Sequence, residues 1–164
     1  MLTKSDLEVN LGRVHEWIKA ADQKVSIFLA FQGVVLTILF PTVFSWLMRH
    51  WVGLQSILQF LLIVGTILII YSLYKSAMAI IPRLNKDEKR RSITYFGDIV
   101  KFKLEEFKNA IDLMSEKEYE QELIDQIYVS SFIAKRKHLE FRLALIIFFC
   151  GMLLLALSYL LFKI

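Results

Sequence analysis

The chain has 164 residues, of which 56% are hydrophobic, and its mean hydropathy of +0.51 excludes an ordinary soluble domain. Its net charge of +4 comes from basic residues mixed with acidic ones, which excludes a nucleic-acid-binding surface as the main feature. The lone Cys150 and the widely separated His15, His50 and His138 exclude a disulfide framework and match no metal-binding motif.

Three long stretches contain no charged residue. They are Val25–Met48 with 24 residues, His50–Tyr74 with 25 and Leu143–Phe162 with 20. A helix needs about 20 residues to cross the ~30 Å hydrocarbon core of a bilayer, and a chain of 164 residues is too short to bury three such helices in water. We therefore predict an all-α integral membrane protein with transmembrane helices at 25–48, 54–81 and 143–162.

Residues 1–24 are predicted to form an N-terminal cytoplasmic amphipathic helix. One apolar stripe recurs at steps of three or four residues, at Leu7, Leu11, Val14, Ile18, Ala21, Val25 and Phe28. Thr3 or Ser5 is expected to cap the start of this helix. No Gly or Pro separates the stripe from the first span, so one long helix is expected to enter the membrane near Lys24. Pro41 is expected to kink the first span or to end its regular part.

The second span is expected to end at Pro82, and residues 82–142 then form a small, helical, membrane-proximal cytoplasmic subdomain. Within it, the β-branched and aromatic residues of 92–100 predict either a short strand or an ordered loop. Two helices follow, and Ser115 with Glu118 makes a capping-box pattern that starts the second of them. Because nothing breaks the pattern after this box, a single helix is expected to continue into the third span.

The distribution of basic residues predicts the orientation in the membrane. Thirteen of the twenty Lys and Arg lie between Arg83 and Arg142, and four more precede Val25. The loop between the first two spans holds only Arg49, and the tail holds only Lys163. Since basic segments stay on the cytoplasmic side, the N-terminus and the charged segment are expected in the cytoplasm and the C-terminus outside.

The sequence contains no recognisable catalytic constellation. It has no Gly-rich phosphate loop, no His-Glu-x-x-His and no Gly-x-Ser-x-Gly motif. The carboxylate pairs Glu105–Glu106 and Glu116–Glu118 have Lys nearby and fit solvated helix faces better than acid–base chemistry. We therefore expect a protein that is not an enzyme and has no cofactor and no metal site.

Two groups of side chains flank the spans, and each has two interpretations. They are Trp17, Asp22 and Lys24 before the first span, and Lys135, Arg136 and Lys137 before the third. The first group either anchors the helix at the interface and pairs locally, or faces the cytoplasmic subdomain and helps to build a pocket. The second group either sets the topology and attracts anionic headgroups, or binds the phosphate of a ligand.

The segment Tyr95-Phe96-Gly97-Asp98 is a third candidate for ligand binding. Its aromatic rings either fill a small core or stack on a planar base. In the second case Gly97 allows close approach of the backbone, and Asp98 accepts a hydrogen bond from a base or ribose group. The residue types alone favour neither interpretation decisively.

These segments also follow one another in a recognisable order. The first span is preceded by Trp17-x-x-x-Ala-Asp-x-Lys24, and the second span ends at Pro82. The next segment is Tyr95-Phe-Gly-Asp-Ile99. The last span is preceded by Ile133-Ala-x-x-Lys137 and Arg142-x-Ala144. In this order and spacing, the chain from Trp17 to its C-terminus resembles the transmembrane effector family of Pycsar antiphage systems. It departs from the family pattern at Lys103-Leu-Glu-Glu106, where Ser-Pro-Glu-Glu is frequent, so this helix start is expected to lack a good cap.

The resemblance implies an antiphage defence effector of the bacterial inner membrane. Such a protein would sense a cyclic pyrimidine mononucleotide, cyclic UMP or cyclic CMP, made by a partner pyrimidine cyclase. Binding in the cytoplasmic segment, by the ten candidate residues, would impair membrane integrity and cause growth arrest or cell death. The effector is expected to be a homo-oligomer that contacts the lipid bilayer and no nucleic acid. The alternative is a small membrane scaffold that recruits a cytoplasmic partner without a nucleotide ligand.

Overall fold

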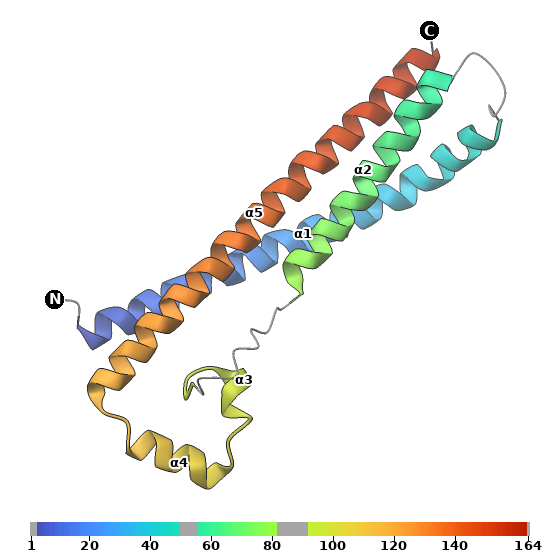
Figure 1. Cartoon of the computed structure of the whole chain (residues 1–164). Helices are drawn as coiled ribbons and strands as arrows, with labels where there is room; N and C mark the ends of the chain where they lie inside the picture. Colours follow the sequence, from blue (N-terminus) through green and yellow to red (C-terminus); the bar gives the residue numbers. More distant parts are fainter. Residues whose placement is uncertain (1–2, 50–55, 82–91, 164) are drawn as a thin grey trace. The chain divides into compact units, whose positions relative to one another are not determined.

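A computed structural model describes residues 3–49, 56–81 and 92–163 of the chain. Its helices are α1 (Lys4–Arg49), α2 (Ser56–Ile80), α3 (Phe96–Ile99), α4 (Leu104–Asp112) and α5 (Glu116–Lys163) (Figure 1). No strand occurs within the described ranges, and α1, α2 and α5 are each long and apolar enough to cross a membrane. The predicted fold class, an all-α integral membrane protein with three transmembrane helices, is confirmed.

Helix α1 is one continuous helix of 46 residues, as its uninterrupted apolar stripe predicts. Thr3 caps its start, because its Oγ1 accepts from the N–H of Asp6 at 3.3 Å, while its own N–H and Oγ1 donate to Asp6 Oδ2 at 2.9 and 2.7 Å. The two hydrogen bonds to the carboxylate, above all the one from the Thr3 N–H, lower the pKa of the Asp6 carboxyl. The expectation that Pro41 ends the regular part of the span is wrong, because α1 continues past it to Arg49. A proline removes one N–H donor, whereas every other backbone group in a bilayer still needs its helical partner.

Contacts between residues divide the chain into two compact units. The polar unit comprises Met1–Lys19 and Pro82–Lys135, and the membrane unit comprises Ala20–Ile81 and Arg136–Ile164. Helices α1 and α5 each contribute residues to both units. Only two of the sixteen acidic residues of the chain, Asp22 and Glu140, fall in the membrane unit. The points at which α1 and α5 leave the bilayer, near residues 24 and 142, stay predictions.

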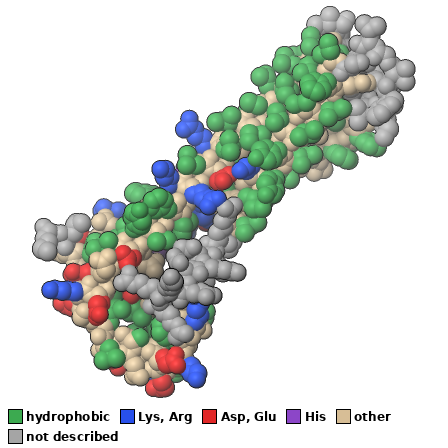
Figure 2. Space-filling view, viewed as in Figure 1, with side chains coloured by type: hydrophobic (Ala, Val, Ile, Leu, Met, Phe, Trp, Pro, Cys, Tyr) green, Lys and Arg blue, Asp and Glu red, His purple; other side chains and the backbone are tan. Residues whose placement is uncertain are grey.

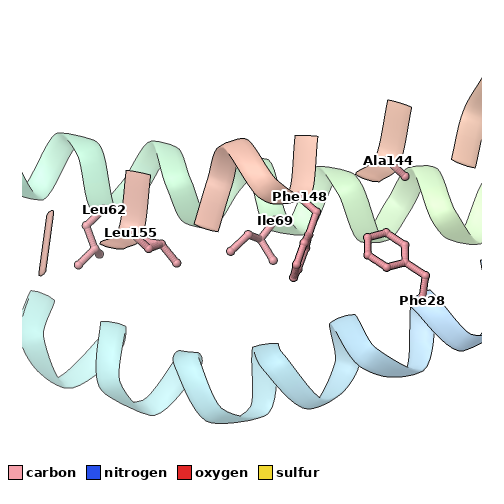
Figure 3. Close-up of a cluster of buried hydrophobic side chains, with 6 residues drawn as sticks. All are labelled: Phe28, Leu62, Ile69, Ala144, Phe148 and Leu155. Atoms are coloured by element: carbon pink, nitrogen blue, oxygen red, sulfur yellow. The ribbon is translucent and has the colours of Figure 1, made fainter. Parts of the chain in front are cut away.

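Apolar side chains from all three long helices fill the core of the membrane unit. The buried cluster consists of Phe28 from α1, Leu62 and Ile69 from α2, and Ala144, Phe148 and Leu155 from α5 (Figure 3). The rings of Phe28 and Phe148 meet edge to face with centroids 5.4 Å apart, a geometry that aromatic quadrupoles favour. Large apolar side chains such as Ile27 and Ile57 face outward, and Figure 2 shows hydrophobic side chains over most of the visible surface of this unit. Such a surface suits the hydrocarbon of a bilayer.

Helices α2 and α5 approach each other closely at two glycines. A Cβ on Gly65 would lie 3.0 Å from the carbonyl oxygen of Gly151, and a Cβ on Gly151 would lie 2.8 Å from that of Gly65. Small residues permit such an approach in lipid, where helix association depends on close packing more than on removal of apolar surface from water. These two glycines therefore serve packing within one chain.

A buried polar network joins the same three helices. Gln32 Nε2 of α1 donates to Ser72 Oγ of α2 at 2.6 Å, and Ser72 Oγ donates to the carbonyl oxygen of Ala144 in α5 at 2.6 Å. Gln32 and Ser72 are fully buried. Because an unpaired polar group costs free energy in an apolar environment, these bonds favour the observed arrangement of the three helices over others.

Candidate functional site

The ten predicted ligand-binding residues are divided between the two units. The polar unit holds Trp17, Tyr95, Phe96, Gly97, Asp98 and Lys135, and the membrane unit holds Asp22, Lys24, Arg136 and Lys137. The side chain of Phe96 lies outside the described part of the structure. Each unit therefore offers its own set of candidate contacts.

Of the two structures predicted for residues 92–100, a short strand or an ordered loop, the strand is wrong, and the segment also contains a short helical turn that neither prediction included. The chain bends and then makes the helical turn α3, in which the carbonyl oxygen of Tyr95 accepts from the N–H groups of Asp98 and Ile99 at 2.9 and 3.0 Å. Ser92 Oγ accepts from the N–H of Tyr95 at 3.0 Å. Such local side-chain bonds to the backbone offer an alternative to a β ladder, and here they override the strand preference of the residue types.

Tyr95 and Gly97 pack directly against each other in the polar unit. A Cβ on Gly97 would lie only 2.7 Å from Cε1 of the Tyr95 ring. The ring therefore occupies the space that a side chain at residue 97 would need. In this arrangement Gly97 serves internal packing, which is the simpler of its two interpretations.

Both carboxylate oxygens of Asp98 have partners inside the polar unit. Oδ1 accepts from Lys101 Nζ at 2.7 Å, and Oδ2 accepts from the N–H of Ser92 at 3.2 Å. The Asp98 side chain is 13% exposed. A base or ribose donor would therefore have to share or replace one of these bonds in order to reach Asp98.

Glu122 of α5 is a functional candidate that the sequence patterns did not indicate. Its Oε1 accepts from the N–H of Ile93 at 2.9 Å, from the N–H and Oγ1 of Thr94 at 3.3 and 3.0 Å, and from Ser92 Oγ. Gln126, one turn further along α5, donates from Nε2 to Ser92 Oγ at 3.2 Å. These contacts join residues about thirty positions apart, so no local spacing could have signalled them.

The N-terminal ends of α1 and α5 also meet within the polar unit. The Tyr119 hydroxyl donates to Glu8 Oε1 at 3.4 Å, and Lys4 Nζ lies 4.8 Å from the centroid of the Tyr119 ring. Burial raises the pKa of the Tyr119 hydroxyl, and the nearby charge of Glu8 raises it further. The hydroxyl therefore remains protonated at neutral pH and can keep donating to Glu8.

Two ion pairs join helices in the membrane unit. Lys137 of α5 pairs with Asp22 of α1, and Lys75 of α2 pairs with Glu140 of α5 at 3.3 Å. The side chain of Lys137 is only 15% exposed. Pairing is expected of charges next to apolar surface, because an unpaired charge there carries a large desolvation cost. Asp22 is therefore paired, but not locally as predicted, because its partner Lys137, a second candidate residue, lies 115 positions away.

The remaining candidates are Trp17, Lys24, Lys135 and Arg136, and all four side chains are exposed. Trp17 has 58% of its surface exposed. An exposed indole suits a membrane interface, and exposed Lys and Arg suit headgroup phosphates. The same exposure leaves these side chains accessible to a soluble ligand, so it is compatible with both interpretations.

The polar contacts described above all join residues of the chain itself. Within the described ranges, no group of three or more His, Cys, Asp or Glu side chains is placed to hold a metal ion. In the polar unit, backbone N–H and hydroxyl donors point to one carboxylate oxygen, Glu122 Oε1. The fold and these contacts define a multi-pass helical membrane protein that carries a hydrogen-bonding polar unit on its transmembrane helices.

The comparison with known families agrees with this description. The model of the Pycsar effector protein domain matches residues 6–162, and the chain therefore belongs to this family. The resemblance inferred from the order of the sequence segments is thus confirmed. Membership makes the chain an effector of antiphage defence at the bacterial inner membrane, with a cyclase partner, and the family is not one of known enzymes. Comparison with curated proteins and with solved structures gave no match.

Proposed function

We propose that the protein senses cyclic UMP or cyclic CMP through its cytoplasmic segment and then impairs the integrity of the inner membrane. The result is growth arrest or death of the infected cell. The observation that carries this proposal is the family match over residues 6–162, in a chain whose apolar helices also build a charged unit. The nucleotide is the product of the partner cyclase.

The proposed ligand contacts are the ten candidate residues. They are Trp17, Asp22, Lys24, Tyr95, Phe96, Gly97, Asp98, Lys135, Arg136 and Lys137. Their chemistry supports this role, and so does the exposure of four of them, Trp17, Lys24, Lys135 and Arg136. Aromatic rings can stack on a pyrimidine, a carboxylate can accept from a base or ribose group, and exposed cations can meet a phosphate. Asp98 already pairs with Lys101, and Lys137 already pairs with Asp22. A ligand that binds Asp98 or Lys137 therefore replaces one of these pairs.

The coupling to the bilayer follows from the two helices that contribute to both units. Residues 4–19 of α1 belong to the polar unit and the rest to the membrane unit, and α5 is divided in the same way after Lys135. A ligand moves such helices only if it binds one arrangement better than the other. A preference of about 10⁴-fold, or ~5.5 kcal/mol, converts a 1:99 mixture into 99:1.

We also propose an orientation of the chain in the membrane and a homo-oligomeric state. The basic residues favour an N-terminus and a polar unit in the cytoplasm, where the cyclase product is made, and a C-terminus outside. A homo-oligomer would allow one binding event to act on several sets of transmembrane helices.

Calorimetry of the detergent-purified full chain tests the ligand. We expect heat with cyclic UMP or cyclic CMP and none with the purine cyclic mononucleotides. Tyr95→Ala and Lys137→Ala are expected to weaken binding while leaving membrane insertion intact. Tyr128→Ala is the matched control, since this ring of the polar unit is 65% exposed and is not a candidate.

Two results would count against these proposals separately. If no cyclic nucleotide gives heat or a thermal shift, nucleotide sensing is wrong and the scaffold that recruits a cytoplasmic partner takes its place. If a nucleotide binds but both Tyr95→Ala and Lys137→Ala keep the affinity of the wild type, the site assignment fails and the family function stands.

A further inference from the structure

The segment Ser92–Thr94 holds a carboxylate in the way that a backbone loop holds a phosphate. Four donors, the N–H groups of Ile93 and Thr94 and the hydroxyls of Ser92 and Thr94, converge on Glu122 Oε1. Successive backbone N–H groups that point to one spot form a concave anion site, of the kind found in phosphate-binding loops. Here the anion comes from the chain itself.

The number of donors exceeds what one carboxylate oxygen can use well. A carboxylate has about four lone-pair sites on its two oxygens, so a single oxygen offers roughly two. Four donors compete for Glu122 Oε1. All four donors go to Oε1, and none of these bonds uses the second oxygen of the Glu122 carboxylate. A cyclic phosphodiester carries the same single negative charge, and one that turns both unbridged oxygens to the segment shares the four donors between two acceptors.

The site is also open to an incoming anion. Thr94, which supplies two of the four donors, is exposed, and the side chain of Glu122 is only partly buried. A glutamate can leave by rotating its side chain, without unfolding α5. Gln126 Nε2 stays in place as a donor to Ser92 Oγ and can keep that hydroxyl oriented after the exchange.

We propose that Ser92–Thr94 is the phosphate subsite of this protein and that Glu122 occupies it in the resting state as an internal competitor. This inference rests on the proposed sensing of a cyclic mononucleotide, and it adds Ser92, Ile93, Thr94 and Glu122 to the candidate residues, beside the exposed cations proposed above for the phosphate. The phosphodiester displaces the Glu122 carboxylate, which frees that part of α5 from the segment. Because α5 also contributes to the membrane unit, the exchange links ligand binding to a helix that crosses the bilayer.

Calorimetry of the full chain in detergent, with cyclic UMP and cyclic CMP as probes, tests the exchange. Glu122→Gln keeps an acceptor oxygen but removes the charge, so it should hold the donors less strongly. We expect its affinity for the nucleotide to rise about tenfold, because a larger fraction of the protein then has a free subsite. Thr94→Val removes one donor and is expected to lower the affinity. Glu105→Gln is the matched control, since this carboxylate of the same unit is 79% exposed and pairs with Lys108.

The outcomes separate this inference from the function on which it rests. If the wild type binds a nucleotide and Glu122→Gln binds it equally or more weakly, the internal competitor is wrong and nucleotide sensing stands. If neither the wild type nor Glu122→Gln gives heat with either probe, nucleotide sensing fails and the subsite fails with it. Should Glu122→Gln lose helical content by circular dichroism, Glu122→Asp replaces it. Its carboxylate is one methylene shorter and reaches the donors less well, so tighter binding is again expected and unchanged binding overturns the exchange.

Discussion

At the scale of single residues, the contact between Gly65 and Gly151 is the most demanding packing feature of the membrane unit. A Cβ on Gly151 would lie 2.8 Å from a backbone oxygen and 2.9 Å from Cγ1 of Ile69. Neither neighbour is the free end of a flexible side chain. Gly151→Ala therefore forces α2 and α5 apart and is expected to destabilise the protein by about 1–3 kcal/mol. Thermal unfolding in detergent, followed by circular dichroism, measures this loss.

Gly33→Ala is the matched control, because Gly33 also lies in a transmembrane helix but a Cβ there would meet nothing within 4 Å. Alanine is a better helix former than glycine by up to about 1 kcal/mol. The control should therefore keep or slightly raise the unfolding temperature. An unfolding temperature for Gly151→Ala that matches that of Gly33→Ala would contradict the close approach of α2 and α5.

Residue contacts differ in how far the sequence could predict them. The caps at Thr3 and Ser115 were predictable, because each side chain bonds to a carboxylate three positions away. Glu122 was not predictable, because its partners lie about thirty residues earlier and the residue itself is one acid among many in its helix. The pairing of Asp22 with Lys137 spans 115 positions. A single sequence shows that both charges sit beside apolar spans, but it cannot show that they meet.

At the scale of elements, the start of α5 depends on a complete capping box. Ser115 donates from its N–H and Oγ to Glu118 Oε2 at 2.8 and 2.7 Å, and the N–H of Glu118 donates to Ser115 Oγ at 3.3 Å. These bonds, first the one from the backbone N–H, lower the pKa of the Glu118 carboxyl below its usual 4.5. The cap therefore stabilises the helix fully above that pH, and its contribution is lost as the pH falls through the lowered pKa.

Ser115→Ala removes the hydroxyl from this box. We expect the pKa of Glu118 to rise toward its ordinary value, and the first-turn amide hydrogens of α5 to exchange several-fold faster at neutral pH. The side-chain carbon shift of Glu118, followed by NMR through a pH titration, and hydrogen exchange detected by mass spectrometry measure the two effects. Ser131→Ala is the control, because this hydroxyl bonds to the carbonyl oxygen of Ile127 inside the same helix. If Ser115→Ala and Ser131→Ala give the same Glu118 pKa and the same amide exchange rates, Ser115 does not stabilise the start of α5.

The helices differ in how well the pattern of the local sequence predicts them. The continuous α1 and α5 followed from apolar spacing without an interruption, which is a property of the local sequence. The start of α4 was expected to lack a good cap, and Lys103 indeed gives no side-chain cap because an ammonium cannot accept a hydrogen bond. The turn α3 was missed because the residues that lead into it, Ser92 and Ile93, are held from outside by Gln126 and Glu122 of α5. Residue preferences describe a segment alone and omit such partners.

At the scale of the whole molecule, the proposed function requires that a ligand bound by the candidate residues alter the transmembrane helices. Helix α5 contributes to both units, and a break in it should separate binding from its effect. Arg142→Pro places the break after the last candidate residue, Lys137. A proline in a helix interior costs about 3 kcal/mol and kinks or breaks the helix. We expect nucleotide affinity close to that of the wild type, together with a large loss of nucleotide-dependent dye release from liposomes.

Arg142→Ala is the matched control at the same position. The Arg142 side chain is exposed, so its removal tests the lost charge without breaking the helix. Since twelve other basic residues remain between Arg83 and Lys137, the topology should hold. The control should therefore bind nucleotide and release dye as the wild type does. If Arg142→Pro releases dye as fully as Arg142→Ala at equal nucleotide occupancy, the signal does not pass along α5. Helix α1, the other helix shared by the two units, would then be the path to test.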